Sequence, residues 1–353
     1  MMKAVRIYGK EDIRVEDVPI SDPKPDQIQI KVKYCGICGS DLHAYTDGFG
    51  LPMHKHPITG REVPITLGHE FSGEVVKLGS EITDFQIGDA VAIEPLIACG
   101  HCANCRAGNY NLCLNMHAED GGNFLGYSDD GGMAEYVNAQ ASFAYKLPKG
   151  MNYELGALTE PTAVAYEAIK KSGLIAGQTV AVMGAGPIGL LTALLAKTMN
   201  ASQVYISDLS EERLAKAQEL GLTTLNPSQV DVNDEIRKDL PNGVDITFEC
   251  AGAQPTLNTA LQITRRGGIV QIVAIFGKPV TIDLSAATMQ GYNINTVLAY
   301  NNSFPLVMGM INNHQDLFKK LITNKLGFDQ AIEGIKSLAT DKSQVKIMIS
   351  PEL

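Results

Sequence analysis

The chain has 353 residues, 45% of them hydrophobic and 19% charged, which is the composition of a globular protein with room for two domains of ordinary size. Its 29 basic and 39 acidic residues give a net charge of −10, and the absence of a basic run argues against a nucleic-acid partner. The N-terminal residues form no apolar signal region, and no run reaches the roughly 18 apolar residues that a membrane helix needs. We therefore expect a cytoplasmic protein with no membrane span.

Residues 1–155 have the pattern of a domain built from strands and turns. Short alternating stretches, such as 28–34 and 71–76, are separated by Gly, Pro and Asp. Six of the seven cysteines also fall here, in the two clusters Cys35/Cys38 and Cys99/Cys102/Cys105/Cys113. Clustered cysteines in a cytosolic protein indicate metal binding before disulfides.

Residues 156–295 change to apolar strands that alternate with amphipathic helices. Strands are expected at 179–184, 204–208, 244–251 and 268–275, with helices at 187–199 and 211–220. Repeated strand–helix–strand units predict a parallel sheet. The rhythm weakens over 296–353, and the closing stretch 342–349 is expected to be a strand that returns to the first domain.

A glycine-rich loop follows the first of these strands at once and opens a helix, with the residues Gly184, Gly186, Pro187, Ile188 and Gly189. In this strand–turn–helix context the glycines allow a tight turn and a close approach of the backbone to a pyrophosphate, while helix N–H groups face the phosphates. The alternative is an incidental glycine-rich turn. The context favours a dinucleotide site.

Asp208 ends the second strand of this region, 24 residues after Gly184. An acidic residue about 20 residues after the loop binds the adenosine ribose hydroxyls and repels a 2′-phosphate, so we expect NAD and not NADP. Asp208 is also a favoured residue type for capping the next helix, a role compatible with the first. Arg213, one turn into that helix, is a second candidate for the ribose.

The four cysteines from Cys99 to Cys113 lie within fifteen residues, close enough for one loop to surround a tetrahedral zinc ion. Four thiolates leave no position for substrate, so this zinc is expected to be structural. An iron–sulfur cluster is the alternative, but the fourth spacing does not fit and hydride transfer needs no one-electron carrier.

A second set of ligand types is scattered along the chain: Cys38, His69 and Glu160. One thiolate, one imidazole and one carboxylate would hold a zinc ion and leave a fourth position open, which is typical of a catalytic site. The pair Cys35/Cys38 could instead be a redox pair, although it lacks the βαβ context of such sites.

Taken in order, these motifs resemble the zinc-containing medium-chain dehydrogenases over the whole chain. The motifs are Gly36-Ile37-Cys38-Gly39-Ser40-Asp41, Gly68-His69-Glu70, the four-cysteine loop, Glu160-Pro161 and the glycine loop. Glu160, the insert 59–66 and the ending 342–346 are most similar to the (R,R)-2,3-butanediol and sorbitol dehydrogenase branch. The resemblance implies a GroES-like β-barrel catalytic domain, a Rossmann domain with a doubly wound parallel sheet, and a homodimer or homotetramer.

The resemblance also implies roles for single residues. Cys38, His69 and an acidic residue hold the catalytic zinc, and members of the family differ on whether the residue at Glu70 or at Glu160 binds directly. We favour Glu160 as the ligand, with Glu70 behind it or exchanging with it. Ser40 is expected to take the alcohol proton and pass it through the cofactor ribose to His43. The other histidines, which show no partner pattern, are interpreted as structural: His54, His56, His101, His117 and His314.

These observations predict an enzyme with two zinc ions per chain that moves a hydride between NAD and a vicinal diol or hydroxyketone, with 2,3-butanediol and acetoin as the first candidates. A sorbitol or other polyol dehydrogenase is the nearest alternative. A catalytically silent NAD-binding protein of the same fold is the alternative from another class, and it would be expected to lose its catalytic metal ligands. All of those ligands are present in this chain.

Overall fold

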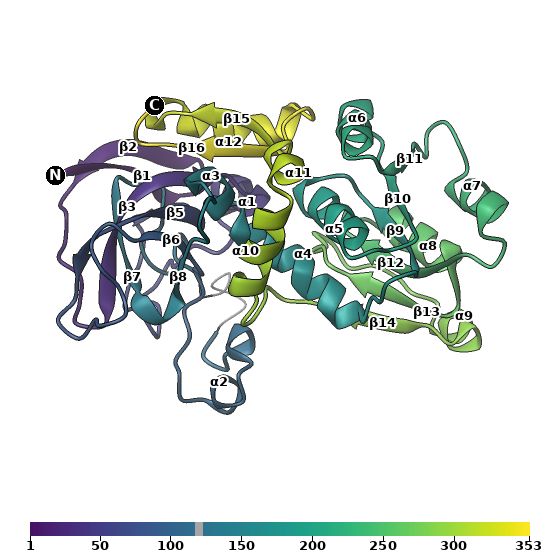
Figure 1. The fold of residues 1–353 in the computed structure, drawn as a ribbon, viewed down its shortest axis with the longest axis horizontal. Coiled ribbons are helices and arrows are strands. Elements are labelled where there is room, and N and C mark those ends of the chain that lie inside the picture. Colours follow the sequence, from purple (N-terminus) through teal and green to yellow (C-terminus); the bar gives the residue numbers. More distant parts are fainter. Residues whose placement is uncertain (117–122) are drawn as a thin grey trace. The chain divides into compact units, whose positions relative to one another are not determined.

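The computed structural model describes residues 1–116 and 123–353, and the chain divides into two compact units (Figure 1). Unit 1 consists of Met1–Glu160 and Phe304–Leu353, and unit 2 of Pro161–Ser303. The first boundary falls near the start of helix α4 (Thr159–Ser172), a few residues after the limit of 155 expected from the sequence. Over the described ranges, no helix is both long and apolar enough to cross a membrane.

Unit 1 is built mainly from strands. These are β1 (Met2–Gly9), β2 (Asp12–Val18), β3 (Gln27–Gly36), β4 (Ile65–Thr66), β5 (Glu70–Leu78), β6 (Ala90–Ile93), β7 (Tyr136–Gln140), β8 (Ala144–Lys146), β15 (Ile322–Leu326) and β16 (Lys346–Ile349). Its helices are α1 (Gly39–Asp47), α2 (Ala103–Arg106), α3 (Tyr153–Ala157), α10 (Phe304–Asn313), α11 (Gln315–Lys319) and α12 (Ala331–Thr340).

The strands of unit 1 form a seven-stranded mixed sheet and a three-stranded sheet of β2, β1 and β4. In the larger sheet β3 lies between β5 and β16, so the C-terminal segment joins strands from the start of the chain, as Figure 1 shows for the yellow β15 and β16. The pairing sets Gly36 opposite Glu70 on one side and opposite Met348 on the other. This register places the C-terminal strand β16 beside the end of β3 and close to Glu70, one of the candidate metal ligands.

Unit 2 alternates strands with helices. Its strands are β9 (Thr179–Met183), β10 (Gln203–Ser207), β11 (Thr223–Leu225), β12 (Val244–Glu249), β13 (Thr264–Ile272) and β14 (Asn293–Thr296). Its helices, besides most of α4, are α5 (Pro187–Thr198), α6 (Glu211–Glu219), α7 (Val232–Asp239), α8 (Gln254–Ile263) and α9 (Leu284–Gln290).

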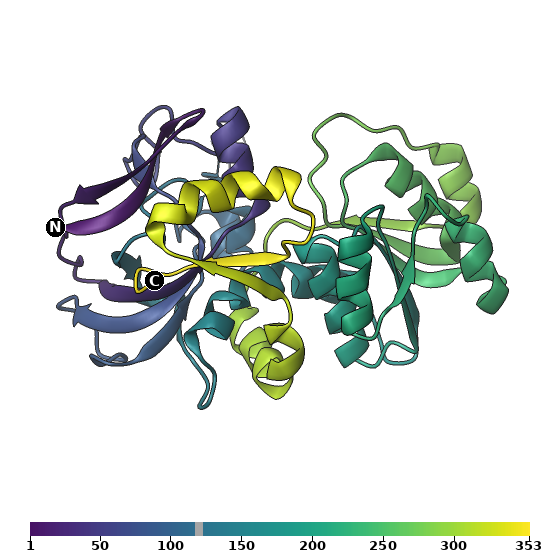
Figure 2. The same cartoon turned by 90° about the horizontal axis from the view of Figure 1, so that it is seen from above.

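The six strands of unit 2 are all parallel, in the order β11-β10-β9-β12-β13-β14. Helices lie on both faces of this sheet (Figures 1 and 2), which explains why β9 is buried almost throughout. The order reverses between β9 and β12, and in doubly wound sheets a ligand binds outside the carboxyl ends of the strands at such a point. The Rossmann arrangement expected from the sequence is confirmed.

One strand of unit 2 differs from the sequence-based expectation. β13 begins at Thr264 and not at Gly268, because Thr264 already pairs with Val244. An irregularity then interrupts the ladder before Ile269 pairs with Ile246, and Gly267 in this stretch has a φ of +69°. Two consecutive glycines, Gly267 and Gly268, interrupt the strand pattern in the sequence, so the sequence indicates a start that is too late.

Candidate active site

Three possible metal ligands of unit 1 lie at the ends of neighbouring elements. Cys38 is the residue before α1, His69 directly precedes β5, and Glu70 is the first residue of that strand. One ligand atom from each lies within 4.8 Å of the other two. The sheet register therefore gathers a thiol, an imidazole and a carboxylate at one point.

His69 is buried, and its Nδ1 atom has no hydrogen-bond partner among the described residues. Asp41 Oδ1 lies 3.9 Å away and is also buried without a hydrogen-bond partner. The other oxygen of Asp41 accepts the backbone N–H of Cys38 at 2.8 Å. A small shift would close the gap between imidazole and carboxylate, an arrangement that orients a histidine for metal binding. The donor set fits a zinc ion.

The carboxylate of Glu70 is held by a buried lysine. Lys346 Nζ lies 2.7 and 2.6 Å from the two oxygens of Glu70 and donates to the backbone oxygen of Ile37 at 3.0 Å. Both side chains are almost fully buried, at 2% and 1% exposure. Burial alone would lower the pKa of Lys346, but attraction to Glu70 and Cys38 raises it above its usual value. Gly36 leaves the room for this pair, since a Cβ there would clash with Glu70 Oε2.

Glu160, the carboxylate that we expect to bind zinc, is buried at 5% exposure. It lies near enough to Lys346 to raise the pKa of that lysine. It does not belong to the group of three ligand atoms within 4.8 Å of one another. Its role as a zinc ligand therefore stays a prediction.

Cys38, Ser40 and His43 belong to the turn and first part of α1. The pKa of Cys38 is raised to about 11. Burial of the Cys38 sulfur and the nearby charge of Glu70 raise it, and a hydrogen bond with Ser40 offsets part of the increase. Ser40 and His43 are three residues apart, so they lie on the same face of the helix. His43 is exposed and pairs with Asp47, with 3.3 Å between Nδ1 and Oδ2.

The four cysteines of the loop from Cys99 to Cys113 converge, with their sulfur atoms all within 4.8 Å of one another. Sγ of Cys105 lies 3.9 Å from that of Cys99 and 3.4 Å from that of Cys102. These values bracket the separation of about 3.8 Å for two thiolates on one tetrahedral zinc. Backbone N–H groups of Cys105 and Leu114 lower the pKa of Cys102 to about 6, which favours the thiolate. The loop fits a structural zinc.

The glycine loop of unit 2 has the geometry of a dinucleotide site. Gly184 has a φ of +98° and donates its N–H to Ser207 O at 2.7 Å. A Cβ at Gly189 would clash with Gly184 O, so this glycine lets α5 pack close to the turn. A Cβ at Gly186 would meet nothing, which leaves the N-terminus of α5 open to a phosphate. Pro187 and Ile188 form the first turn of that helix.

Asp208 follows β10, and its two oxygens accept the N–H groups of Ala185 and Ser210 at 2.8 and 2.9 Å. Arg213 Nη1 lies 3.6 Å from the same carboxylate. The residues expected to contact the ribose are thus brought together beside the glycine loop.

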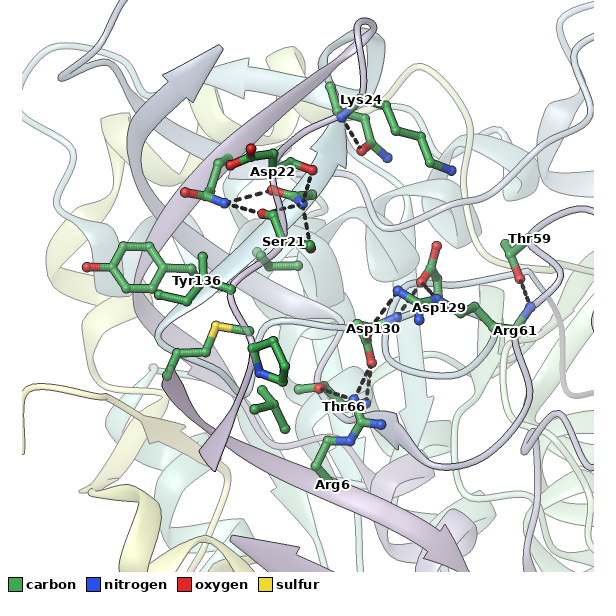
Figure 3. A pocket seen from close by; sticks show the side chains of 18 residues that line it. Arg6, Ser21, Asp22, Lys24, Thr59, Arg61, Thr66, Asp129, Asp130 and Tyr136 are labelled. Atoms are coloured by element: carbon green, nitrogen blue, oxygen red, sulfur yellow. Dashed lines mark hydrogen bonds and ion pairs between the residues drawn. The ribbon is translucent and has the colours of Figure 1, made fainter. Parts of the chain in front are cut away.

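A polar cavity of about 550 Å³ lies elsewhere in unit 1 (Figure 3). Its guanidinium groups are engaged: Arg6 and Arg61 both pair with Asp130, and Arg61 also pairs with Asp129. Asp130 accepts the N–H of Thr66 at 2.9 Å as well. The network therefore anchors the insert 59–66, which leads into His69.

No sequence pattern assigns a role to Lys346 or Asp41, although both lie in stretches that carry the family resemblance. Lys346 stands at the start of an apolar strand, and a lysine there indicates a buried ion pair, because a lysine is rarely buried unless it is paired. Among the histidines interpreted as structural, His56 is buried and bonds to Asn123 Oδ1 at 2.8 Å. His117 lies outside the described residues.

Comparisons with known proteins agree with this geometry. Residues 24–149 match the family model described as "Alcohol dehydrogenase GroES-like domain", and residues 187–313 the one described as "Zinc-binding dehydrogenase". The chain is 40% identical to a (R,R)-butanediol dehydrogenase of Bacillus subtilis, over 99% of this chain and all of that protein. It is 33% identical to a sorbitol dehydrogenase of the same species, over 99% and 97%. A crystal structure of 2R,3R-butanediol dehydrogenase from Bacillus subtilis superposes with a TM-score of 0.93, covering 99% of this chain and 100% of that one.

If the four-cysteine loop binds its own zinc, Cys102→Ser should lower the zinc content from about two ions per chain to about one and reduce Tm by at least about 5 °C. Elemental analysis and calorimetry measure both quantities. Cys250→Ser, a cysteine outside the two clusters, is the matched control and should keep both ions. A Cys102→Ser enzyme with two tightly held zinc ions would contradict this assignment.

Removing Lys346 should leave the buried carboxylate of Glu70 without its cation. We expect Lys346→Met to lower the free energy of unfolding by about 3 kcal/mol, and addition of Glu70→Gln to recover part of the loss. Lys77→Met, which removes an exposed ion pair with Asp22, should cost less than about 1 kcal/mol. Urea titrations of these variants test the difference, and equal losses for Lys346→Met and Lys77→Met would show that the buried pair has no special weight.

Proposed function

The chain belongs to the zinc-containing medium-chain alcohol dehydrogenases, and from this premise we propose that it oxidises (R,R)-2,3-butanediol to acetoin with NAD and catalyses the reverse reduction. The observation that carries the choice of substrate is the 40% identity to a (R,R)-butanediol dehydrogenase over the full length of both chains. The convergence of Cys38, His69 and Glu70 supports a working metal centre.

In this proposal Cys38, His69 and Glu160 hold the catalytic zinc, and Glu70 stays with Lys346. Direct binding by Glu70 would compete with two short contacts to a buried ammonium group. A zinc ion held by one thiolate, one imidazole and one carboxylate would supply Lewis-acid chemistry, with an affinity for oxygen that favours a substrate carrying two adjacent oxygens.

The proton of the alcohol leaves through side chains of α1. Ser40 Oγ accepts it while giving up its own hydroxyl proton, and His43, on the same face of the helix, takes up a proton and releases it to water. The position of His43 suits that last step, because its side chain is 65% exposed to water. Asp41, 3.9 Å from His69, would orient the imidazole if the gap closed, and it takes no part in the proton path.

NAD is the proposed hydride acceptor. Asp208 places a carboxylate beside the glycine loop, fixed by two backbone N–H groups, where it can accept a hydrogen bond from a ribose hydroxyl. A 2′-phosphate at the same position would meet that negative charge. Arg213, 3.6 Å from the carboxylate, balances part of its charge.

Two other readings lead to different results in the same assay. The 33% identity to a sorbitol dehydrogenase is compatible with a polyol dehydrogenase, which would have a higher kcat/KM for sorbitol than for butanediol. A silent NAD-binding protein would hold NADH and turn over neither substrate. A cytoplasmic location and a homodimer or homotetramer remain part of the proposal as expected from the sequence.

We predict that purified zinc-loaded enzyme with NAD has a kcat/KM for (R,R)-2,3-butanediol at least about tenfold above that for 2-butanol, or about 1.4 kcal/mol in transition-state binding. The physical reason is the second oxygen of the diol, which 2-butanol lacks. NADH absorbance with butanediol stereoisomers, 2-butanol and sorbitol measures this ratio.

Equal kcat/KM for the diol and 2-butanol, or a higher kcat/KM for sorbitol, would contradict the proposal that butanediol is the substrate. Equal kcat/KM with NADP in place of NAD would contradict the role of Asp208. No turnover of any alcohol by a chain that carries two zinc ions would favour the silent protein.

A further inference from the structure

Unit 2 contains a fully buried acidic residue that the proposed mechanism does not use. Glu249 is the last residue of β12 and has no exposed surface. It pairs in register with Met183, the last residue of β9, so it lies at the carboxyl ends of the two strands where the strand order reverses. This edge of a doubly wound sheet is where a dinucleotide binds.

The carboxylate of Glu249 accepts hydrogen bonds from the loop that follows β12. Its Oε1 accepts the N–H groups of Ala251 and Gly252 at 3.2 and 3.0 Å, and Oε2 lies 3.2 Å from the same Gly252 nitrogen. The hydroxyl of Thr256, in the first turn of α8, is 2.7 Å from Oε1. One buried side chain thus fixes the backbone of residues 250–253, which we call the β12 loop.

The β12 loop packs directly against the glycine loop. A Cβ at Gly184 would lie only 3.0 Å from the Cβ of Ala251, and the N–H of Cys250 donates to Met183 O at 2.9 Å. On its other side, a Cβ at Gly252 would come within 2.8 Å of Ile275 O. The β12 loop is therefore packed between the glycine loop and Ile275.

Burial raises the pKa of Glu249, and the bonds from Thr256 and from the loop backbone lower it. Among the ion pairs of the described residues none involves Glu249, so its partners are hydroxyl and backbone donors. A buried carboxylate bonded in this way costs desolvation energy, and it persists where it imposes one backbone conformation.

We propose that Glu249 is a positioning residue for the dinucleotide, which holds the β12 loop in the conformation that receives the nicotinamide half. The inference rests on the proposed NAD-linked function. Each half of a doubly wound sheet binds one mononucleotide. The half made of β9, β10 and β11 carries the glycine loop and Asp208, and the half made of β12, β13 and β14 begins with the strand that ends in Glu249.

The same strand offers a matched control at its opposite end. Asp245, near the start of β12, also accepts a backbone N–H, that of Thr179 at 2.8 Å, and pairs with Arg265 at 2.7 Å. It lies at the amino ends of the strands, away from the cofactor edge. Its loss should reduce stability without changing the cofactor site.

The test is the Kd of the zinc-loaded enzyme for NADH, by fluorescence titration, and for AMP, by calorimetry, at a temperature where each variant is folded. Glu249→Gln removes the negative charge and puts an amide donor in place of Oε2, 3.2 Å from the Gly252 nitrogen, and should weaken NADH binding about tenfold while the Kd for AMP changes less than about twofold. Asp245→Asn should lower Tm and leave both constants unchanged. Thr256→Val should weaken NADH about threefold, and Thr256→Ser, which keeps the hydroxyl, should restore it.

Wild-type affinity for NADH in folded Glu249→Gln would overturn the inference and leave the NAD-linked function intact. If Glu249→Gln does not fold, Thr256→Val decides: unchanged NADH binding overturns the inference, and weaker binding rescued by Thr256→Ser supports it. Equal weakening by Asp245→Asn, or equal loss of AMP and NADH affinity, would show general loosening of the sheet. A wild-type chain that binds no NADH would overturn the proposed function and the inference together.

Discussion

The metal centre of unit 1 depends on a buried ion pair between residues from opposite ends of the chain. Lys346, on strand β16 of the larger sheet, neutralises Glu70, which lies beside the candidate ligands Cys38 and His69. Without the lysine, two acidic groups and a thiol would share one dry site. The return of the C-terminal segment into the sheet is therefore more than a packing detail. It brings a buried positive charge to the carboxylate of Glu70.

Carboxylates organise backbone in both units in the same way. Asp41 accepts the N–H of Cys38, Asp208 accepts those of Ala185 and Ser210, and Glu249 accepts two from the β12 loop. Each sits where a loop must keep one conformation to meet a metal or a cofactor. Because a buried acceptor with several N–H donors tolerates little displacement, each carboxylate favours one conformation of its loop.

The sequence predicted what depends on local spacing. The glycine loop, the parallel strands around it and the four-cysteine cluster all follow from residues within a short distance of one another, and the structure agrees on each. The ion pair between Lys346 and Glu70 could not be predicted from the sequence. It joins positions 276 residues apart and depends on the register with which β16 pairs with β3. Glu249 was hidden for a different reason: an acidic residue at the end of an apolar strand has no motif, and only its bonds to the following loop reveal a role.

The most direct test of this account is an anomalous difference map at the zinc edge, from crystals of the zinc-loaded enzyme with NAD. We predict two zinc peaks per chain. One should lie among the sulfurs of the four-cysteine loop, and the other should be bound by Cys38, His69 and Glu160 while Lys346 keeps its contacts with Glu70. A second peak bound by Glu70, with Lys346 turned away and Glu160 unbound, would contradict the assignment of the ligands. A map with no second peak would contradict the proposed chemistry itself.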